Sequence, residues 1–182
     1  CIMASVSQSP IEMFSDYKVV ANQWLAALDT YSDADLRNKP SEGEWCIGQV
    51  YTHLITSGQG FFMRGAKQCI RNEGTDTTEG KNKMGEGLFA LGGFPDQKFG
   101  MPAPVAQQPP MPDSKESIRE NLLTQLEKME QLAEEMAGYN PNHKTTHPLF
   151  GFLNAGEWYI MNAWHFAHHL RQKARIDAYL GK

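Results

Sequence analysis

Residues 158–180, WYIMNAWHFAHHLRQKARIDAYL, constrain the fold most, because they repeat apolar residues at helical spacing and carry three of the six histidines. One side of such a helix is mostly apolar, and a bundle buries that side against its neighbours. His165 and His169 lie on it, four residues apart, so both imidazoles can reach one point. His168 lies about 80° away and is the weaker candidate. The segment therefore predicts a long helix with an inward-facing histidine pair.

An inward-facing histidine pair has two interpretations. Backbone groups or water can satisfy two imidazoles packed in a core, which is the ordinary structural outcome, or one metal ion can bind both. His53, on a helix predicted over residues 45–72, is the candidate for a third ligand. Three neutral imidazoles from two helices form the open tripod of a catalytic metal site, with a fourth position left for water. His143 and His147 are also four apart, but they lie in a predicted loop, 143–154, and stay alternative ligands.

Several other polar residues are candidates for roles around this site. Gln49, one turn before the third histidine, and Gln172 would orient ligands or a bound water. Glu157, two turns before the histidine pair, is a candidate base, although an acidic residue in the first turn of a helix also interacts favourably with the helix dipole. Glu44 and Arg64 are further candidates, and the sequence gives no geometry to choose between them.

The apolar periodicity predicts an all-α four-helix bundle. Helical repeats cover residues 10–31, 45–72, 113–138 and 158–180, with Asp113 as the expected N-cap of the third helix. No segment shows the alternation of a half-buried strand. A di-iron carboxylate site is disfavoured because the chain lacks the pair of Glu-x-x-His motifs that such bundles use.

Residues 73–112 form the one long irregular segment and hold six of the ten prolines and seven of the sixteen glycines. Within it, residues 83–91 are the best candidate for a short helix. A connection of this length can return along a helix, so the second and third helices would run parallel in an up-down-down-up topology with one crossover. Its apolar residues predict that it covers part of the bundle and lines the mouth of the site, and the alternative is a mobile insert without a role.

Length and charge narrow the class of protein. The 182 residues suit a single domain over 1–182, and 17 basic against 21 acidic residues give a net charge of −4 without a Lys/Arg cluster. We therefore expect a small-molecule or protein partner and no nucleic acid. No transmembrane run or signal peptide is present, and three cysteines without CxxC spacing suit a reducing cytoplasm. A lipidated N-terminal Cys1 is the alternative.

Two segments resemble the DinB-like superfamily of bundle proteins. They are KPSEGEWCIGQVYTHL (39–54) and HPLFGFLNAGEWYIMNAWHFAHHLRQ (147–172), which carry its HP-x-hydrophobic-G-x-Leu and H-x-x-x-H-Leu-Arg-Gln patterns. The resemblance implies an up-down-down-up four-helix bundle whose metal-binding triad corresponds to His53, His165 and His169. Two positions depart from the pattern: Cys46 stands where a Ser or Thr helix cap is common, and HHLRQ replaces the HHRGQ of one branch.

The resemblance also implies classes of activity. Similar proteins include thiol S-transferases that use a low-molecular-weight thiol, and a thiol-dependent isomerase. The expected function is therefore a metal-dependent enzyme, transferase or hydrolase, that activates a thiol or water against a small electrophilic substrate; zinc or nickel is the expected metal, with iron as a further option. The alternative is a non-catalytic metal- or ligand-binding protein, or a stress-response interaction protein with a structural metal. A homodimer through exposed apolar residues of the first helix is a further expectation.

Overall fold

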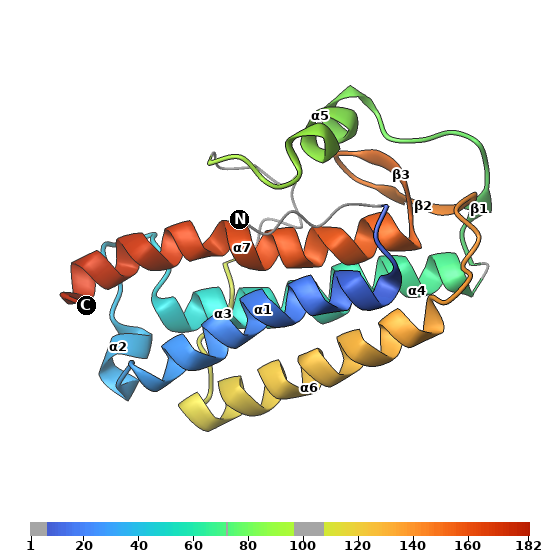
Figure 1. Cartoon of the computed structure of the whole chain (residues 1–182). Coiled ribbons are helices and arrows are strands. Elements are labelled where there is room, and N and C mark those ends of the chain that lie inside the picture. Colours follow the sequence, from blue (N-terminus) through green and yellow to red (C-terminus); the bar gives the residue numbers. More distant parts are fainter. Residues whose placement is uncertain (1–6, 72, 97–107) are drawn as a thin grey trace.

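Four long helical segments lie side by side in the computed structural model of the chain, which describes residues 7–71, 73–96 and 108–182 (Figure 1). They are accompanied by two short helices and a small sheet. The elements are α1 (Pro10–Asp29), α2 (Asp33–Arg37), α3 (Ile47–Ser57), the π-helical segment η1 (Gly58–Met63), α4 (Arg64–Ile70), β1 (Thr75–Asp76), α5 (Lys83–Leu91), α6 (Lys115–Glu135), β2 (His143–His147), β3 (Gly151–Asn154) and α7 (Ala155–Leu180).

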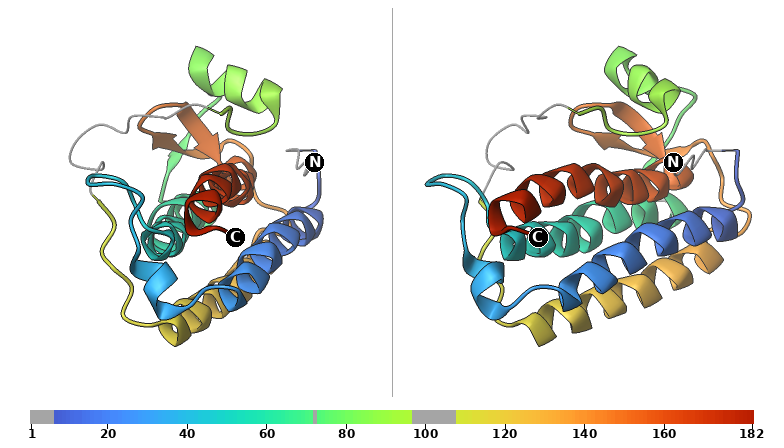
Figure 2. Two further views of the ribbon diagram at one scale, coloured as in Figure 1. Left: turned by 90° about the vertical axis from the view of Figure 1, so that its left-hand side faces the viewer. Right: turned by 60° about the vertical axis from the view of Figure 1, so that its left-hand side comes forward.

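The bundle has the predicted up-down-down-up topology. Helices α1 and α7 run in one direction, and the α3–α4 segment and α6 run in the other (Figure 1). Viewed along the bundle, α7 packs beside α1 and the α3–α4 segment, and α6 packs beside the same two on the opposite side (Figure 2). Because α4 and the start of α6 lie at opposite ends, the connection between them spans the length of the molecule.

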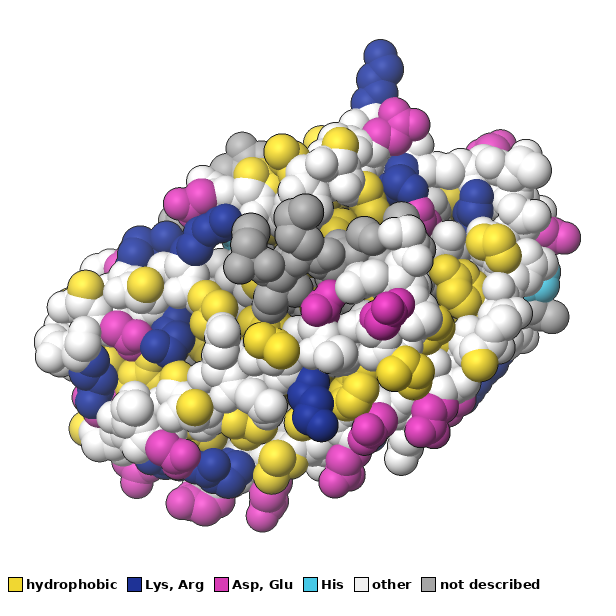
Figure 3. Space-filling view, in the orientation of Figure 1, with side chains coloured by type: hydrophobic (Ala, Val, Ile, Leu, Met, Phe, Trp, Pro, Cys, Tyr) yellow, Lys and Arg dark blue, Asp and Glu magenta, His cyan; other side chains and the backbone are white. Residues whose placement is uncertain are grey.

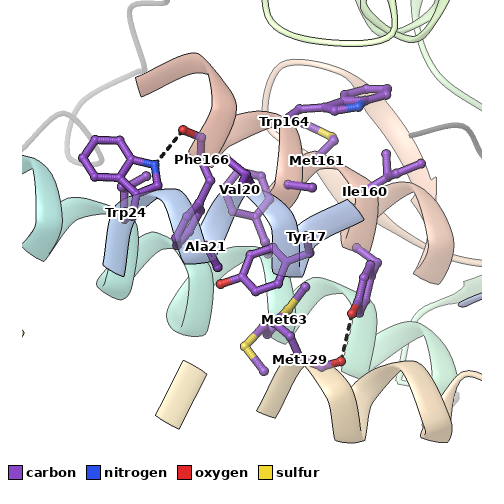
Figure 4. Packing of buried hydrophobic residues seen from close by; sticks show 14 of the residues in the cluster. Tyr17, Val20, Ala21, Trp24, Met63, Met129, Ile160, Met161, Trp164 and Phe166 are labelled. Atoms are coloured by element: carbon purple, nitrogen blue, oxygen red, sulfur yellow. Dashed lines mark hydrogen bonds between the residues drawn. The ribbon is translucent and has the colours of Figure 1, made fainter. Parts of the chain in front are cut away.

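Large aromatic side chains fill the core, and the polar ends of Trp24 and Tyr159 are hydrogen-bonded (Figure 4). Trp24 is fully buried and its Nε1 donates a hydrogen bond of 3.1 Å to the carbonyl of Phe166. The hydroxyl of Tyr159 donates to the carbonyl of Met129 at 2.9 Å. Buried Trp and Tyr normally need such partners, so these two bonds fix α7 against α1 and α6.

The helix starts follow side-chain capping. Ser9 caps α1 and forms a reciprocal capping box with Glu12. The third long helix begins one residue later than predicted, because Ser114, and not Asp113, accepts the N–H of Ser117 at 3.0 Å. The Asp113 carbonyl instead accepts a hydrogen bond from Arg37, which anchors the end of the connection to α2.

The second long helix is not regular over the predicted range. It begins after the N-cap Cys46, ends at Ile70, and contains the π-helical segment η1 in its middle. A π-helical turn takes one residue more than an α-helical one. Each extra residue shifts the following side chains by about 100° relative to an uninterrupted α-helix. The side chains of α4 therefore lie on different faces from those expected of a continuous helix.

A small antiparallel sheet is an addition that the sequence analysis did not foresee. Strands β2 and β3 form a hairpin in which Lys144 pairs with Asn154 and His147 with Gly151, and β1 adds at the other edge of β2. Strands of two to five residues are too short to show alternation above the background of a loop. The predicted 143–154 loop is thus a hairpin, and the four-helix bundle is otherwise confirmed.

The part of the 73–112 connection around α5 lies over α7, whereas its last described residues lie against α3 (Figures 1 and 2). Its short helix, α5, has the predicted bounds, and Phe89 of α5 packs edge-on against Trp164 of α7 with ring centroids 4.9 Å apart. Phe99, Met101 and Val105, which were expected to pack with them, lie outside the described residues. In its described part, the chain holds no helix with the length and apolar character needed to cross a membrane.

Candidate metal centre

Three histidine side chains meet between α3 and α7. Nε2 of His165 lies 2.9 Å from Nε2 of His53 and 3.1 Å from Nε2 of His169. All three candidate ligand atoms lie within 4.8 Å of one another, so the group could hold a metal ion. Two nitrogens that each lie about 2.0–2.1 Å from one zinc are about 2.9–3.4 Å apart at coordination angles between 90° and 110°. The spacing of the triad fits a common ion.

Burial keeps these imidazoles neutral, which is the form that binds metal. The cost of desolvating the charged form, with a smaller contribution from the nearby His168, lowers the pKa of His53 to about 4. The same cause, followed by the charge of His53, lowers the pKa of His169 to about 3. Burial also holds the pKa of His165 well below its usual range, with its two partners adding to the effect. At neutral pH each of the three rings therefore carries one proton, on either Nδ1 or Nε2, and the other nitrogen has a free lone pair.

The hydrogen bonds around the triad favour tautomers whose Nε2 atoms can bind an ion. Nδ1 of His169 lies 2.8 Å from the side-chain oxygen Oε1 of Gln172, so it is the nitrogen that carries the proton and donates it. Its Nε2 then presents a lone pair towards His165. Nδ1 of His53 lies 3.3 Å from the hydroxyl of Ser57, which allows the same tautomer. Nδ1 of His165 is buried without a hydrogen-bond partner, so it is free to carry the proton and leave Nε2 to bind an ion. Three imidazole nitrogens at these distances fit a divalent metal.

Aromatic rings pack against the triad, whose His53 and His169 are half-buried. Trp45, just before the N-cap of α3, stacks over His169 at an interplanar angle of 14° and also contacts His53. Phe62 of η1 lies against His165 with centroids 5.1 Å apart. Phe94, from the connection after α5, contacts His165 as well, at 6.5 Å. The last contact brings the connection to the edge of the triad, as expected of a segment that lines its mouth.

Of the other predicted site residues, Gln172 contacts the triad, whereas Gln49 and Glu157 are engaged elsewhere. The Gln49 side chain accepts from the backbone N–H of Cys46 and donates to the carbonyl of Pro109 at 2.7 Å. Glu157 accepts from the backbone N–H of Asn154 and pairs with Lys81. Both residues occupy the third position of a helix and complete its cap.

The remaining candidates also lie outside the triad. Glu44 is exposed and accepts from the hydroxyl of Ser41. His147 is buried in an aromatic cluster, where it stacks on Phe150 and accepts the N–H of Leu149 at 3.1 Å. Within the described residues, the metal-capable group contains neither His147 nor His143.

Arg64 follows His53 by eleven residues, which would put both on one face of an uninterrupted α-helix, and the π-helical segment between them changes this. Arg64 faces α6, where it lies in the lining of a surface hollow. Its neighbour Gly65 faces α7 instead, since a Cβ built there would lie 2.4 Å from Cδ2 of Trp158. A shift of one residue is the expected effect of one extra residue in the helix.

The sequence analysis missed the aromatic residues around the triad. Trp45 lies before the N-cap of α3, outside the helix, so helical spacing could not place it beside His53. Phe62 had no local signal either, because its position depends on the π-helical segment. Ser57, four residues after His53, lay one turn away and was identifiable.

A four-helix bundle with a buried three-histidine group that could hold a metal is the class of protein that this fold and site define. The chain belongs to the DinB superfamily, whose sequence profile matches residues 17–172. It is similar to a solved structure described as TT2238, a four-helix bundle protein, with 20% sequence identity and a TM-score of 0.53 over 91% of this chain and 98% of that one. At this identity the likeness shows the fold alone. No protein with a curated description matches the chain.

Proposed function

We propose that this protein is a metal-dependent enzyme that activates a thiol or a water molecule for attack on a small electrophilic substrate. The observation that carries the proposal is the convergence of three neutral imidazoles at Nε2 distances of 2.9 and 3.1 Å. A divalent metal held there, with zinc or nickel favoured and iron as a further option, would lower the pKa of a thiol or water in its open position and so provide a nucleophile near neutral pH.

Both candidates for a fourth protein ligand form other interactions, which supports a metal site with an open position. A structural metal is closed by four protein ligands, whereas a catalytic one keeps a position for water or substrate. His147 and Glu157 are the candidate site residues that could act as a fourth ligand. His147 is held by the Leu149 N–H, and Glu157 by Lys81 and the cap of α7. Among the described residues, the metal-capable group consists of three histidines alone.

The chain's own residues have separable roles in this proposal. His53, His165 and His169 hold the ion, and Gln172 fixes the tautomer of His169. Trp45 and Phe62 exclude water from the far sides of the rings, which strengthens electrostatic interactions at the site. We propose a low-molecular-weight thiol as the co-substrate of a transferase reaction, because no carboxylate among the candidates reaches the triad to act as a base on water.

Elemental analysis and a thiol-conjugation assay test the proposal together. The purified protein should contain about one equivalent of divalent metal. With metal, it should accelerate conjugation of cysteine or glutathione to a bimane halide, and His53→Ala should abolish both metal content and rate. His168→Ala, which removes a neighbouring histidine outside the triad, is the matched control and should retain both.

Two results would overturn the proposal. Unchanged metal content in His53→Ala would remove the triad as the site. Full metal occupancy without acceleration of either thiol conjugation or ester hydrolysis across a panel of small electrophiles would favour the non-catalytic alternative, in which the ion only holds α3 to α7.

A further inference from the structure

A surface hollow of about 400 Å³ lies between the α4 segment and α6. Its volume is within the range of about 300–1,000 Å³ that small-molecule sites occupy. None of the triad histidines lies in its lining, so it is a separate feature of the molecule. The lining consists of Gln59, Met63, Arg64, Lys67, Gln68, Arg71, Glu73 and Lys128.

The lining is strongly basic in a chain that carries a net charge of −4. Four cationic side chains, Arg64, Lys67, Arg71 and Lys128, face the hollow, and Glu73 is the one carboxylate in the lining. By contrast, acidic side chains gather along the edge of the molecule formed by α6 in the view of Figure 3. The lining of the hollow therefore carries an excess of positive charge although the chain as a whole is slightly acidic.

The cations of α4 are not neutralised by the protein itself. Arg64, Lys67 and Arg71 form no ion pair with any residue of 7–71, 73–96 or 108–182. Ion pairs in this part of the chain use Lys81, Arg119, Lys173 and Lys182 instead. Like charges that share one concavity repel one another, and the low-dielectric walls of a hollow strengthen their combined field. A bound anion would relieve that repulsion.

The backbone geometry aligns these cations. Arg64 and Lys67 of α4 and its C-cap residue Arg71 are three and four residues apart, so they lie on one side of the helix. The preceding π-helical segment turns this side towards α6 and away from the triad. There, Lys128 is oriented by a hydrogen bond of 3.1 Å from its Nζ to Oε1 of Gln59, a residue of η1. The hollow thus combines three unpaired cations with a fourth that is held in place.

We propose that this hollow is a binding site for a compact polyanion that carries at least two phosphoryl groups. Two arginines provide planar, bidentate donors that match phosphate oxygens, and the two lysines add point charges. Gln59 and Gln68 provide amide groups beside them. The formal charge of the lining exceeds what one phosphate monoanion would neutralise, which is why the ligand class is a polyphosphate or a multiply phosphorylated small molecule.

Titration calorimetry with inorganic triphosphate, at an ionic strength of about 0.15 M, tests the site. The parent protein should bind about one equivalent in a saturable manner. The double variant Arg64→Gln/Arg71→Gln should bind at least about tenfold more weakly, because half of the cations are lost. Both residues are exposed, so the bundle should stay folded, which circular dichroism checks. The control Lys18→Gln/Lys83→Gln removes the same charge at exposed positions outside the hollow and should bind as the parent does.

Triphosphate also chelates metals, so the same titration is repeated on His53→Ala. Binding should be unchanged there, because the hollow does not use the triad. Loss of binding in His53→Ala, equal weakening in both double variants, or absence of saturable binding by the parent would each overturn the proposal.

A second arm distinguishes a free ligand from a lipid headgroup. Phosphatidylcholine vesicles with and without phosphatidylinositol bisphosphate are sedimented with the protein. Retention that requires the phosphorylated lipid and is lost with Arg64→Gln/Arg71→Gln would assign the phosphoryl groups to a headgroup. Absence of retention, with triphosphate binding intact, would assign them to a small molecule in solution.

Discussion

At the scale of single residues, the hydrogen bond between Gln172 and His169 determines which ring nitrogen of His169 faces the other two histidines. Partners of this kind typically change metal affinity by about 10–100-fold when removed. We expect Gln172→Leu to weaken zinc binding by at least about tenfold while the helix remains intact. Competition with a chromogenic chelator measures the affinity.

The control for this change is Gln23→Leu, which makes the same substitution at an exposed position of α1. It should bind zinc as tightly as the parent. Equal affinity in Gln172→Leu and Gln23→Leu would show that the tautomer of His169 does not depend on Gln172.

His147 is the residue whose burial should make stability depend on pH. Desolvation lowers its pKa to about 4, from 6.5 for the unperturbed group. Between these values, the unfolded chain binds more protons than the folded one, so the stability contribution is complete above about pH 6.5 and falls as the pH decreases towards 4. For this residue the loss is about 2–3 kcal/mol at about pH 4.5.

His147→Asn tests this contribution, since an Asn oxygen can accept the Leu149 N–H without titrating. Urea unfolding of metal-free protein at about pH 7 and about pH 4.5 gives the pH-dependent part for each protein. The parent should lose about 2–3 kcal/mol more than the variant over this interval. Equal losses of unfolding free energy in the parent and in His147→Asn would mean that His147 is already accessible to protons in the folded state.

The position of a single residue could be predicted where helical spacing alone determines which way its side chain points. His53, His165, His169 and Gln172 lie in regular helix, and the structure brings them together as their spacing suggested. Gln49 and Glu157 had equally suitable positions in sequence. Each lies at the third position of a helix, however, where a capping interaction directs the side chain back to the helix start.

At the scale of elements, Gly65 determines how closely α4 approaches α7. A Cβ at this position would lie 2.4–2.7 Å from three ring atoms of Trp158. The indole is itself confined by Phe61 and His147, at centroid distances of 5.2 and 5.1 Å. We therefore expect Gly65→Ala to lower the free energy of unfolding by about 1–3 kcal/mol through overpacking, as measured by urea denaturation.

Gly60→Ala is the matched control, because Gly60 lies in the preceding segment and nothing is within 4 Å of a Cβ built there. It should leave stability unchanged or raise it by up to about 1 kcal/mol, since alanine has the higher helix propensity. If both variants were equally stable, α4 would not pack against the Trp158 ring in the manner described.

The elements that the sequence predicted least well depend on tertiary contacts. The predicted helix of residues 45–72 contains a π-helical segment at Gly58–Met63, where a Cβ at Gly58 would meet the side chain of Gln125 from α6. That contact lies between helices far apart in sequence, so no local pattern records it. The basic hollow depends partly on the same kind of contact: three of its cations are close together in sequence, and Lys128 joins them only because α4 faces α6.

At the scale of the whole molecule, the triad joins the second and last long helices across a distance of more than one hundred residues in sequence. A ligand that binds only the folded state stabilises it by RT ln(1 + [L]/Kd), which is about 2.7 kcal/mol at a free concentration one hundred times Kd. For a domain of this size, 1 kcal/mol corresponds to about 2–4 °C in Tm. Metal occupancy should therefore matter to the stability of the complete bundle.

We expect removal of metal by a chelator to lower the Tm of the parent by about 5–10 °C, and readdition of zinc to restore it. His53→Ala should lose this response, because two histidines on one helix cannot bind α3 to α7. His168→Ala should keep it, since His168 contacts His169 from outside the metal-capable group. Differential scanning calorimetry of the three proteins with and without chelator measures the response. A parent Tm that is indifferent to chelator and zinc would mean that no ion links these helices, because an ion bound to all three imidazoles is lost when the bundle unfolds.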